Sequence, residues 1–459
     1  MSGVVDAAGG VWRKMDASPD LAALHAANPA RYPHLLESVA HGTPPGRFDI
    51  LFAFPGRVLA LDAGGMVRED RVPLPGVDFL SALDRAYRAR QIAAIENSPV
   101  PFHGGWFLFL SYELIAQIEP RFRALPRDPE LPVAQATRFP AAVVRDRLRN
   151  CAYLVCERGQ EHLLEAMQCD LVEAIPAEEG GDPTVAAIEE ERPEDYLAHV
   201  RRIKEYIAAG DVFQVNLSRG WRAVFSHPIP PVGVYRRLRA ANPAPFSGLM
   251  TFPGGAIISS SPERLIEIRG RTVRTRPIAG TYPRGGDRDE DERRARELLA
   301  HPKERAEHVM LIDLERNDLG RVCRPGSVRV SELMGLESYR HVHHIVSEVC
   351  GELREGVTPG EAIRAVFPGG TITGCPKVRC MEIIAELERG PRGAYTGSMG
   401  YLNRDGSLDL NILIRTLVQS GSTLSFRAGA GIVADSIPER ELNETRAKAR
   451  GLLAALGVR

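Results

Sequence analysis

The predicted strands of this chain come in clusters, and helices separate the clusters rather than the single strands. Strand patterns occupy residues 213–224, 248–260, 263–268 and 271–276, and a second group fills 396–434. Strands this close along a chain pair antiparallel, because a parallel pair needs a crossover of a dozen or more residues. The clusters therefore predict an α+β fold with large antiparallel sheets, rather than an alternating α/β fold.

Helical periodicity is strongest in three segments. One face of the segment 193–209 is apolar, and Gly210 supplies a C-terminal stop signal. A long helix is predicted over 289–316 and a terminal helix over 438–456. Shorter helical segments are predicted near 78–95, 341–351, 358–366 and 376–389.

The N-terminal part shows weaker patterns. Residues 1–20 have no periodicity and are expected to be frayed. Residues 48–56 are predicted to form a strand that ends in a Pro-Gly turn, with 57–61 as its hairpin partner. Further strands are predicted at 104–110 and within 139–156.

A charged stretch rich in glycine is predicted to divide the chain. Residues 177–183 read Ala-Glu-Glu-Gly-Gly-Asp-Pro, a composition typical of a linker. We expect an N-terminal region at 1–176, a linker at 177–190 and a catalytic domain at 191–459.

The composition is that of an ordinary globular protein. The 459 residues carry a formal net charge of −1, and 25% are charged, which argues against nucleic acid or an anionic membrane as partner. No apolar run approaches the ~20 residues of a membrane-spanning helix, and the N-terminus lacks a secretion signal. Seven scattered cysteines favour reduced thiols, so a cytoplasmic location is expected.

Two glycine-rich segments have the composition of anion-binding turns. Residues 368–377 combine turn formers, hydroxyl groups and a proline at a helix start, without the spacing of a Walker loop. Residues 428–431 read Ala-Gly-Ala-Gly after a strand, where glycine permits close approach of a ligand. Either segment could equally be a structural turn.

Arg415 lies in an otherwise apolar segment that is predicted to be a strand. Alternation places it on the same face as Leu413 and Leu417, toward a core. A guanidinium group there needs a carboxylate partner, which can come from the protein or from a ligand. Both interpretations remain open from the residues alone.

Two pairs of glutamates are spaced three residues apart on predicted helices. They are Glu304 with Glu307 and Glu441 with Glu444, so each pair shares one helix face. Such a pair is commonly just a solvated face. Two pairs could also hold Mg²⁺, which takes one or two carboxylates plus waters and a substrate oxygen.

Other reactive side chains give weaker indications. The histidines at 341, 343 and 344 fit no standard zinc spacing, so a general acid is the better functional interpretation. Cys375 and Cys380 do not lie in strand-to-helix elbows, so we expect no glutaminase nucleophile in this chain.

Residues 276–285 read Arg-Pro-Ile-Ala-Gly-Thr-Tyr-Pro-Arg-Gly and resemble the active-site signature of the chorismate-utilising enzymes. The resemblance covers about 190–459 strongly and the N-terminal part more loosely. Further motifs occur in the order seen in that family: Gly-Asp-Val-Phe-Gln-Val-Asn-Leu-Ser at 210–218, Ser-Pro-Glu-Arg at 261–264, Arg-Ala-Glu-His at 305–308, Asp-Leu-Glu-Arg-Asn-Asp-Leu-Gly-Arg-Val at 313–322, Thr-Ile-Thr-Gly-Cys-Pro-Lys at 371–377 and Ile-Val-Ala-Asp-Ser at 432–436.

The resemblance implies a sandwich of two antiparallel sheets with helices outside. It also implies Mg²⁺ as cofactor, chorismate as substrate, and a heterodimer with a separate glutamine amidotransferase subunit that delivers ammonia. Matched residue by residue, it assigns Mg²⁺ binding to Glu307 and Glu444. It assigns general acid/base chemistry to Glu263, and it assigns to His344 the role of helping the C4 hydroxyl to leave.

The remaining residues implied by the resemblance surround the substrate. Thr281 is grouped with the catalytic residues, and the other positions are predicted to contact chorismate. Those positions are Ala279, Gly280, Thr371, Tyr395, Arg415 and the N–H groups of Gly429 and Gly431.

Two branches of the family differ in product, and this chain resembles both. The alanine at position 279 resembles the residue that anthranilate synthases carry there, because aminodeoxychorismate synthases typically carry a nucleophilic lysine at this position. Residues 35–38, with Glu37 and Ser38, resemble the tryptophan-binding segment of anthranilate synthase. The opposite resemblance, to aminodeoxychorismate synthase, comes from residues 47–50, 242–247 and 368–374.

The last of these segments carries Gly-Gly where anthranilate synthases more often carry Ala-Gly. We therefore expect 4-amino-4-deoxychorismate, a precursor of 4-aminobenzoate and folate, as the product. Anthranilate is the alternative, and a catalytically silent regulatory homologue is a further one.

Overall fold

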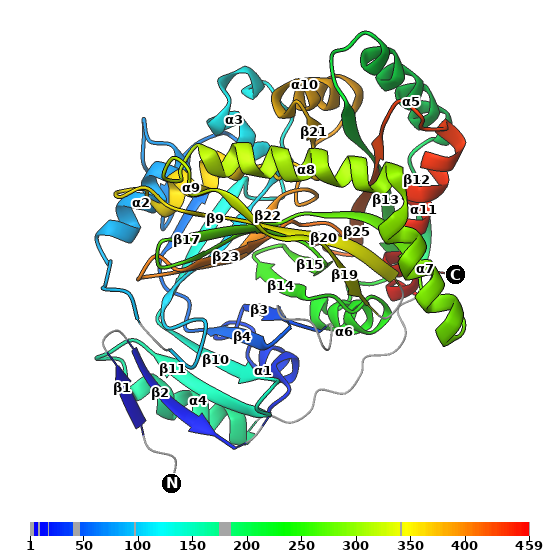
Figure 1. Ribbon diagram of the computed structural model, residues 1–459. Coiled ribbons are helices and arrows are strands. Elements are labelled where there is room, and N and C mark those ends of the chain that lie inside the picture. The colour runs from blue at the N-terminus through cyan, green and yellow to red at the C-terminus, as the bar shows by residue number, and fades with distance from the viewer. Residues whose placement is uncertain are drawn as a thin grey trace.

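Two large antiparallel sheets face each other and form the body of the molecule (Figure 1). The computed structural model describes residues 4–7, 10–16, 18–39, 46–95, 98–173, 185–339 and 342–458. Apolar side chains from both sheets, among them Phe52, Phe107 and Met250, fill the space between them. This arrangement confirms the predicted α+β sandwich.

The first sheet, called sheet A, joins N-terminal and C-terminal strands where β3 pairs with β14. A short strand, β21 (Gly374–Cys375), pairs with β13 outside the main order. The other strands lie in the spatial order β1 (Val4–Ala7), β2 (Gly10–Met15), β11 (Cys151–Cys156), β10 (Ala141–Asp146), β4 (Phe48–Ala53), β3 (His34–Glu37), β14 (Phe246–Phe252), β15 (Gly255–Ser261), β24 (Thr416–Ser420), β25 (Thr423–Ile432), β13 (Gln214–Phe225) and β12 (Val185–Glu190).

The second sheet, called sheet B, mixes the two parts of the chain in the same way, through the pairing of β22 with β8. Strand β19 (Arg329–Ser338) pairs with β20 outside the main order. The other strands lie in the order β18 (Ile278–Pro283), β20 (Val342–Glu352), β17 (Thr272–Arg276), β16 (Arg264–Arg269), β23 (Leu408–Asn411), β22 (Ser398–Asn403), β8 (Gly105–Leu110), β9 (Ala134–Phe139), β5 (Val58–Leu61), β6 (Val67–Glu69) and β7 (Val72–Pro73).

Helices cover the outer faces of both sheets, and each face has its own apolar cluster. Sheet A is covered by α1 (Leu21–Ala27), α4 (His162–Glu173), α6 (Pro231–Ala241) and α11 (Pro438–Ala455). Sheet B is covered by α2 (Phe79–Arg88), α8 (Pro302–Gly320) and α9 (Pro359–Val366). The remaining helices are α3 (Ile115–Ile118), α5 (Pro193–Ala208), α7 (Arg288–Ala300) and α10 (Lys377–Leu387).

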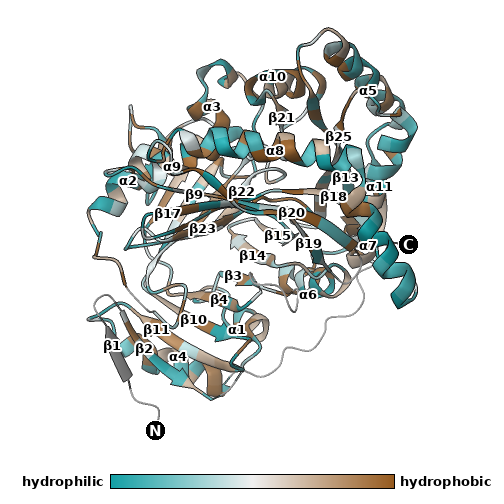
Figure 2. Cartoon of the chain, viewed as in Figure 1, coloured by the Kyte–Doolittle hydropathy of each residue, from teal (hydrophilic) through white to brown (hydrophobic). Residues whose placement is uncertain are grey.

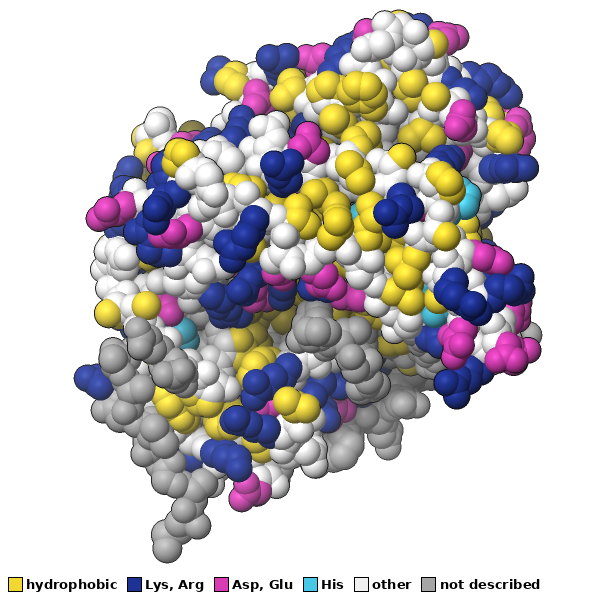
Figure 3. Space-filling model, in the orientation of Figure 1, with side chains coloured by type: hydrophobic (Ala, Val, Ile, Leu, Met, Phe, Trp, Pro, Cys, Tyr) yellow, Lys and Arg dark blue, Asp and Glu magenta, His cyan; other side chains and the backbone are white. Residues whose placement is uncertain are grey.

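Helix α7 is a surface helix with mostly polar and charged side chains. It is hydrophilic along most of its length in Figure 2, and charged side chains of both signs gather at its place in Figure 3. Only Ala295 and Leu298 of this helix are buried. The helix therefore lies on the surface, held by a narrow apolar stripe.

The segment predicted as a helix at 341–351 is strand β20 in the structure, so that prediction was wrong. The strand is paired on both sides, with β17 and β18 along one edge and β19 along the other. Its residues from His343 to Ser347 are all buried. A strand buried on both faces shows no alternation, and periodicity alone cannot separate it from a buried helix.

Three further expectations are corrected. The segment 289–316 contains two helices, because Pro302 forces His301 out of the helical conformation. Strands β4 and β5 do not form a hairpin but lie in different sheets, and Phe54 at φ 61° redirects the chain between them. Residues 4–7 and 10–15 are paired strands rather than a frayed end.

The predicted division at 177–190 stays a prediction. Residues 174–184 lie outside the described residues, and 185–190 form β12, which pairs with β13. Both sheets contain strands from either side of the division. In the described part of the chain, no helix is long and apolar enough to cross a bilayer.

We expect Gly400→Ala to destabilise the fold. A Cβ at this position of β22 would collide with the Asp409 carbonyl of the neighbouring strand. Overpacking of this kind costs about 1–3 kcal/mol, which should appear as a lower urea midpoint. Gly390→Ala is the matched control, because a Cβ there meets no atom within 4 Å. Equal midpoints for the two variants would contradict this account of the sheet.

Candidate active site where the chain crosses between the sheets

Two of the connections that carry the chain from one sheet to the other run side by side. The first, between β15 and β16, carries Glu263, and the second, between β23 and β24, carries Arg415. The Ile412 N–H donates to the Glu263 carbonyl at 3.0 Å, and the Ser260 N–H donates to the Arg415 carbonyl at 3.1 Å. These backbone bonds place the two predicted site residues next to each other.

The backbone of Arg415 differs from the prediction. Alternation placed it inside a strand, on the face of Leu413 and Leu417, whereas it lies after the end of β23 with φ 51°. A positive φ is uncommon for a residue with a side chain, and it often marks a functional position. Here it lets the chain leave sheet B and enter sheet A.

The Arg415 guanidinium forms no ion pair with any residue that the structure describes. Burial lowers its pKa, while Tyr339 and the Glu263 carboxyl act in the opposite direction. The first interpretation from the sequence, a structural ion pair, is therefore not seen in the described ranges. A carboxylate ligand would supply the missing negative charge.

Glu263 is a buried carboxyl group that faces this arginine. It is 4% exposed, and its Oε1 has no hydrogen-bond partner within the described residues. Burial raises the pKa of Glu263 to about 7; the Thr371 hydroxyl opposes that rise, and the Glu315 carboxyl adds to it. A carboxyl group that titrates near neutrality has the property that a general acid/base needs.

His344 and Thr281 lie opposite each other on β20 and β18. The Thr281 hydroxyl is 2.9 Å from His344 Nδ1, and the buried Nε2 has no partner in the part of the chain described. Burial lowers the pKa of His344 to about 3, and Arg415 lowers it further. The imidazole is therefore neutral at physiological pH, and a neutral ring can donate or accept hydrogen bonds but carries no positive charge.

Two glycines bring the backbone of β25 to the site. A Cβ on Gly429 would lie 2.6 Å from the Tyr395 hydroxyl, and one on Gly431 would collide with the Gln214 amide. Strand β24 pairs with β25 only as far as Phe426. Beyond that residue, this edge of β25 has no strand partner in the described chain, so its N–H groups can bind an anion.

The predicted metal ligands come from α8 and α11. Gln214 Nε2 donates to Glu307 Oε1 at 3.0 Å, and Lys448 Nζ lies 2.7 Å from Glu444 Oε1. Burial raises the pKa of Glu307, and Glu304 adds to this effect. Glu307 thus lies where a cation would be stabilising.

The described residues contain no ready cluster of three or more metal-binding side chains. Magnesium needs only one or two protein carboxylates, because water and substrate oxygens complete its shell. Glu307 and the half-exposed Glu444 therefore fit a hydrated Mg²⁺, and the assignment stays a prediction.

The signature at 276–285 begins at the last residue of β17 and includes all of β18, which contains a bulge between Ala279 and Thr281. Gly280 occupies the bulge at φ 67°, and its missing side chain leaves room for Glu304 and Leu298. Its carbonyl lies 3.4 Å from His344 Nδ1. Ala279 is 7% exposed and offers only a methyl group to its surroundings.

Two residues of the site were missed from the sequence. Lys448 Nζ donates to the Gly429 carbonyl at 3.0 Å in addition to its pairing with Glu444. The Tyr339 ring contacts His344 edge-on, with ring centroids 5.6 Å apart. The i,i+4 spacing of Glu444 and Lys448 could have identified the lysine, whereas nothing in the sequence pattern marks Tyr339.

Glu37 and Ser38 line a separate pocket of about 430 Å³. The Tyr235 hydroxyl donates to Glu37 at 2.7 Å, and the Ser38 hydroxyl donates to the Pro245 carbonyl at 2.7 Å. The pocket also contains Phe48, Phe246, Met399 and Arg264, the residue next to Glu263. Residues 35–38, which resemble a tryptophan-binding segment, thus border a cavity. Tryptophan as the ligand of this cavity stays a prediction.

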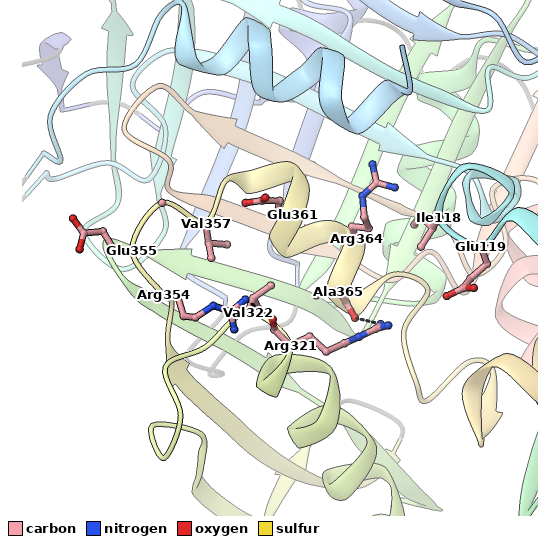
Figure 4. Close-up of a pocket in the computed structure, with 11 residues that line it drawn as sticks. Ile118, Glu119, Arg321, Val322, Arg354, Glu355, Val357, Glu361, Arg364 and Ala365 are labelled. Atoms are coloured by element: carbon pink, nitrogen blue, oxygen red, sulfur yellow. Dashed lines mark hydrogen bonds between the residues drawn. The ribbon is translucent and has the colours of Figure 1, made fainter. Parts of the chain in front are cut away.

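A further cavity of about 560 Å³ lies at the C-terminal end of α8, beside α9 (Figure 4). Arg321, Arg354 and Arg364 surround it, and Figure 4 shows Arg321 reaching the Ala365 carbonyl. None of the described residues that line it is among the predicted site residues. This cavity is separate from the candidate active site.

Comparison with known proteins identifies the family. Residues 59–454 match the model of the chorismate binding enzymes. This chain belongs to the chorismate-binding enzyme family. It is 42% identical over 453 residues to anthranilate synthase component 1 of Thermus thermophilus, covering 96% of this chain and 95% of that protein. It is also 45% identical over 366 residues to aminodeoxychorismate synthase component 1 of Bacillus subtilis, with 77% of each chain covered.

Solved structures agree with the fold. The crystal structure of anthranilate synthase component I from Streptococcus pneumoniae TIGR4 matches with a TM-score of 0.78 and 33% identity. The match covers 89% of this chain and 93% of that one.

Glu263→Gln should stabilise the protein at alkaline pH. The folded-state pKa of about 7 lies above the ordinary 4.5, so the folded state keeps a proton that the unfolded chain loses between these values. Stability therefore falls as pH rises from about 4.5 to 7, by at most about 3 kcal/mol. Glutamine removes this loss.

Urea unfolding at pH 8 and pH 5 measures the effect. The gain of Glu263→Gln over the wild type should be large at pH 8 and shrink toward pH 5. Asp313→Asn, which alters a carboxylate that is 77% exposed, is the control. A gain of the same size at both pH values would show that Glu263 is not held protonated by burial.

Proposed function

We propose that this protein aminates chorismate with ammonia and releases 4-amino-4-deoxychorismate. The observation that carries the proposal is the Arg415 guanidinium, which lies beside Glu263 and lacks a carboxylate partner among the described residues. A substrate with two carboxylates suits such a site, because one of them can neutralise Arg415. Membership of the chorismate-binding family supports chorismate as that substrate.

The enolpyruvyl carboxylate is proposed to bind Arg415 and the open edge of β25. Gly429 and Gly431 allow the carboxylate to approach the backbone N–H groups of that edge. The Tyr395 hydroxyl borders the position of Gly429 and would add a hydrogen bond. Together these donors would orient the ring between Glu263 and His344.

Glu263 is proposed to exchange the proton that the reaction requires. Its pKa of about 7 leaves both protonation states populated near neutral pH. His344 is neutral, so it is proposed to hydrogen-bond the C4 hydroxyl through Nε2 while Thr281 fixes its ring. Thr371 would line the same face as Glu263.

Mg²⁺ is proposed to be held by Glu307 and Glu444, with water and the ring carboxylate as further ligands. When bound, it would withdraw electron density from the ring carboxylate. Gln214 would orient Glu307 through the 3.0 Å hydrogen bond. Lys448, which pairs with Glu444, would help to hold the second ligand in place.

Ammonia is proposed to be the attacking nucleophile. Ala279 has no amine that could form an adduct with the ring, in contrast to the lysine typical of aminodeoxychorismate synthases. Burial raises the pKa of both Cys375 and Cys380, which disfavours a glutaminase thiolate at either position. A glutamine amidotransferase subunit is therefore the proposed source of ammonia.

The choice of product rests on segments around the site. Residues 47–50, 242–247 and 368–374 resemble the aminodeoxychorismate branch. The structure gives a reason for Gly369 at the place where anthranilate synthases more often carry alanine: a Cβ there would lie 2.7 Å from Ile412 Cδ1. Because of the resemblance of these three segments, 4-amino-4-deoxychorismate is our first choice of product.

Anthranilate synthase is the second candidate, and specific observations favour it. Ala279 matches that branch, and the relative from Thermus thermophilus is similar over nearly the whole chain. Residues 35–38, which resemble the tryptophan-binding segment of such an enzyme, supply Glu37 and Ser38 to the lining of a pocket. A silent homologue is disfavoured, because Glu263, His344 and Arg415 are all present.

An assay of the product separates these candidates. Purified protein with chorismate, Mg²⁺ and an ammonium salt at alkaline pH should consume chorismate. Added aminodeoxychorismate lyase should then yield 4-aminobenzoate, which chromatography detects. Fluorescent anthranilate formed without lyase would reject the proposed product, and unconsumed chorismate would reject the enzyme.

Glu307→Gln should raise the Mg²⁺ concentration needed for half-maximal turnover by about tenfold or more, because it removes a charged ligand. Glu297→Gln is the matched control on α7, where the carboxylate is 51% exposed and pairs with Arg293. Titration of Mg²⁺ at saturating chorismate measures the effect. An unchanged Mg²⁺ response would remove Glu307 from the metal site.

A further inference from the structure

Helix α8 buries an acidic side chain for which the proposed reaction has no role. Glu315 is 5% exposed, and burial raises its pKa to about 7, with Asp318 adding to the rise. No described residue forms an ion pair with it. Lys377, whose charge acts on Glu315, pairs instead with Asp318 and donates to two backbone carbonyls.

A double-glycine turn lies between Glu315 and the connection that carries Glu263. On one side, a Cβ on Gly370 would lie 3.2 Å from Glu315 Oε1 and 2.5 Å from Leu314. On the other side, a Cβ on Gly369 would lie 2.7 Å from Ile412 Cδ1. Ile412 in turn donates its N–H to the Glu263 carbonyl. The turn therefore packs against both helix α8 and the connection that carries Glu263.

The same turn leads directly into Thr371, whose hydroxyl influences Glu263. Both Thr371 Oγ1 and Glu263 Oε1 are buried without a hydrogen-bond partner among the described residues. Glu263 is also influenced by Glu315 and Lys448, and it acts on Arg415. Two buried carboxyl groups thus interact across one turn, and neither has a directly paired cation in the ranges described.

We propose that Glu315 is a positioning residue for Glu263, which it orients through the turn at 369–371 and keeps protonated through its own negative charge. The inference rests on the proposed function, because it assigns Glu263 the proton that the reaction uses. Two neighbouring buried carboxyl groups cannot both ionise without repulsion. In its ionised form, Glu315 therefore favours the acid form of Glu263 and its reprotonation after each turnover.

Two substitutions separate charge from orientation. Glu315→Gln removes the charge but keeps the shape and the carbonyl oxygen near Gly370, whereas Glu315→Leu removes both. The Glu315→Gln variant should shift the pH profile of kcat/KM by about half to one pH unit toward lower pH, with KM changed less than about twofold. The Glu315→Leu variant should show the same shift and lose kcat by about tenfold or more.

Asp313→Asn is the control on the same helix, since this carboxylate is 77% exposed and pairs with Arg316. Its profile should overlay the wild type. A Glu315→Gln profile that also overlays the wild type would overturn the inference, and so would a loss of kcat without any shift.

A double-mutant cycle tests the coupling without using the reaction. At pH 8, unfolding of the Glu263→Gln, Glu315→Gln and double variants gives three changes in the folding equilibrium constant. Each single substitution should raise the folding equilibrium constant by some factor. The factor for the double variant should be smaller than the product of the two single factors, by about fivefold or more. Independent gains would overturn the inference. Wild type that leaves chorismate unconsumed, with the coupling intact, would instead reject the proposed function alone.

Discussion

The candidate active site depends on the positive charge of one partly buried arginine, Arg415. Arg415 lies at the turn between two sheets, and no described side chain neutralises its guanidinium. Burial of an uncompensated charge is costly, so a chain would keep it only where a ligand supplies the opposite charge. The left-handed backbone at φ 51° fixes the arginine in that position.

The other groups of the site can be understood from the same electrostatic situation. The arginine helps to keep His344 neutral, and the neighbouring carboxyl of Glu263 titrates near pH 7 because burial outweighs the nearby cations. Glu307, on α8, is influenced by the neighbouring carboxylate of Glu304. In the proposed complex, Arg415 would neutralise one carboxylate of the substrate, and Mg²⁺ held by Glu307 would neutralise the other.

Much of this architecture could be predicted from the sequence. Clustered strands predicted large antiparallel sheets, and the family resemblance predicted that they form a sandwich. The predicted helices that carry Glu304, Glu307, Glu441 and Glu444 are also present. The ordered motifs predicted the family, which the comparisons confirm. The roles of individual residues stay predictions.

The failures have physical reasons. Strand β20 is buried on both faces and therefore lacks the alternation that marks a strand. Arg415 was placed in a strand because periodicity does not report a single positive φ. Tyr339 follows β19 and contacts His344 of β20, and the helix predicted at 341–351 hid this pairing of two consecutive strands. Glu315 belonged to a motif that fixes the family, but its burial beside Gly370 required the structure.

The most direct test of the account is the affinity for chorismate of an Arg415→Met variant, measured by calorimetry in the presence of Mg²⁺. The loss of a charge-assisted contact to a carboxylate should weaken binding by about 30-fold or more, while far-ultraviolet circular dichroism stays that of the wild type. The Arg415→Lys variant keeps the charge but not the planar fork of the guanidinium group. Its affinity for chorismate should lie between those of the wild type and the Arg415→Met variant. An Arg415→Met variant that folds normally and binds chorismate as tightly as the wild type would contradict the account.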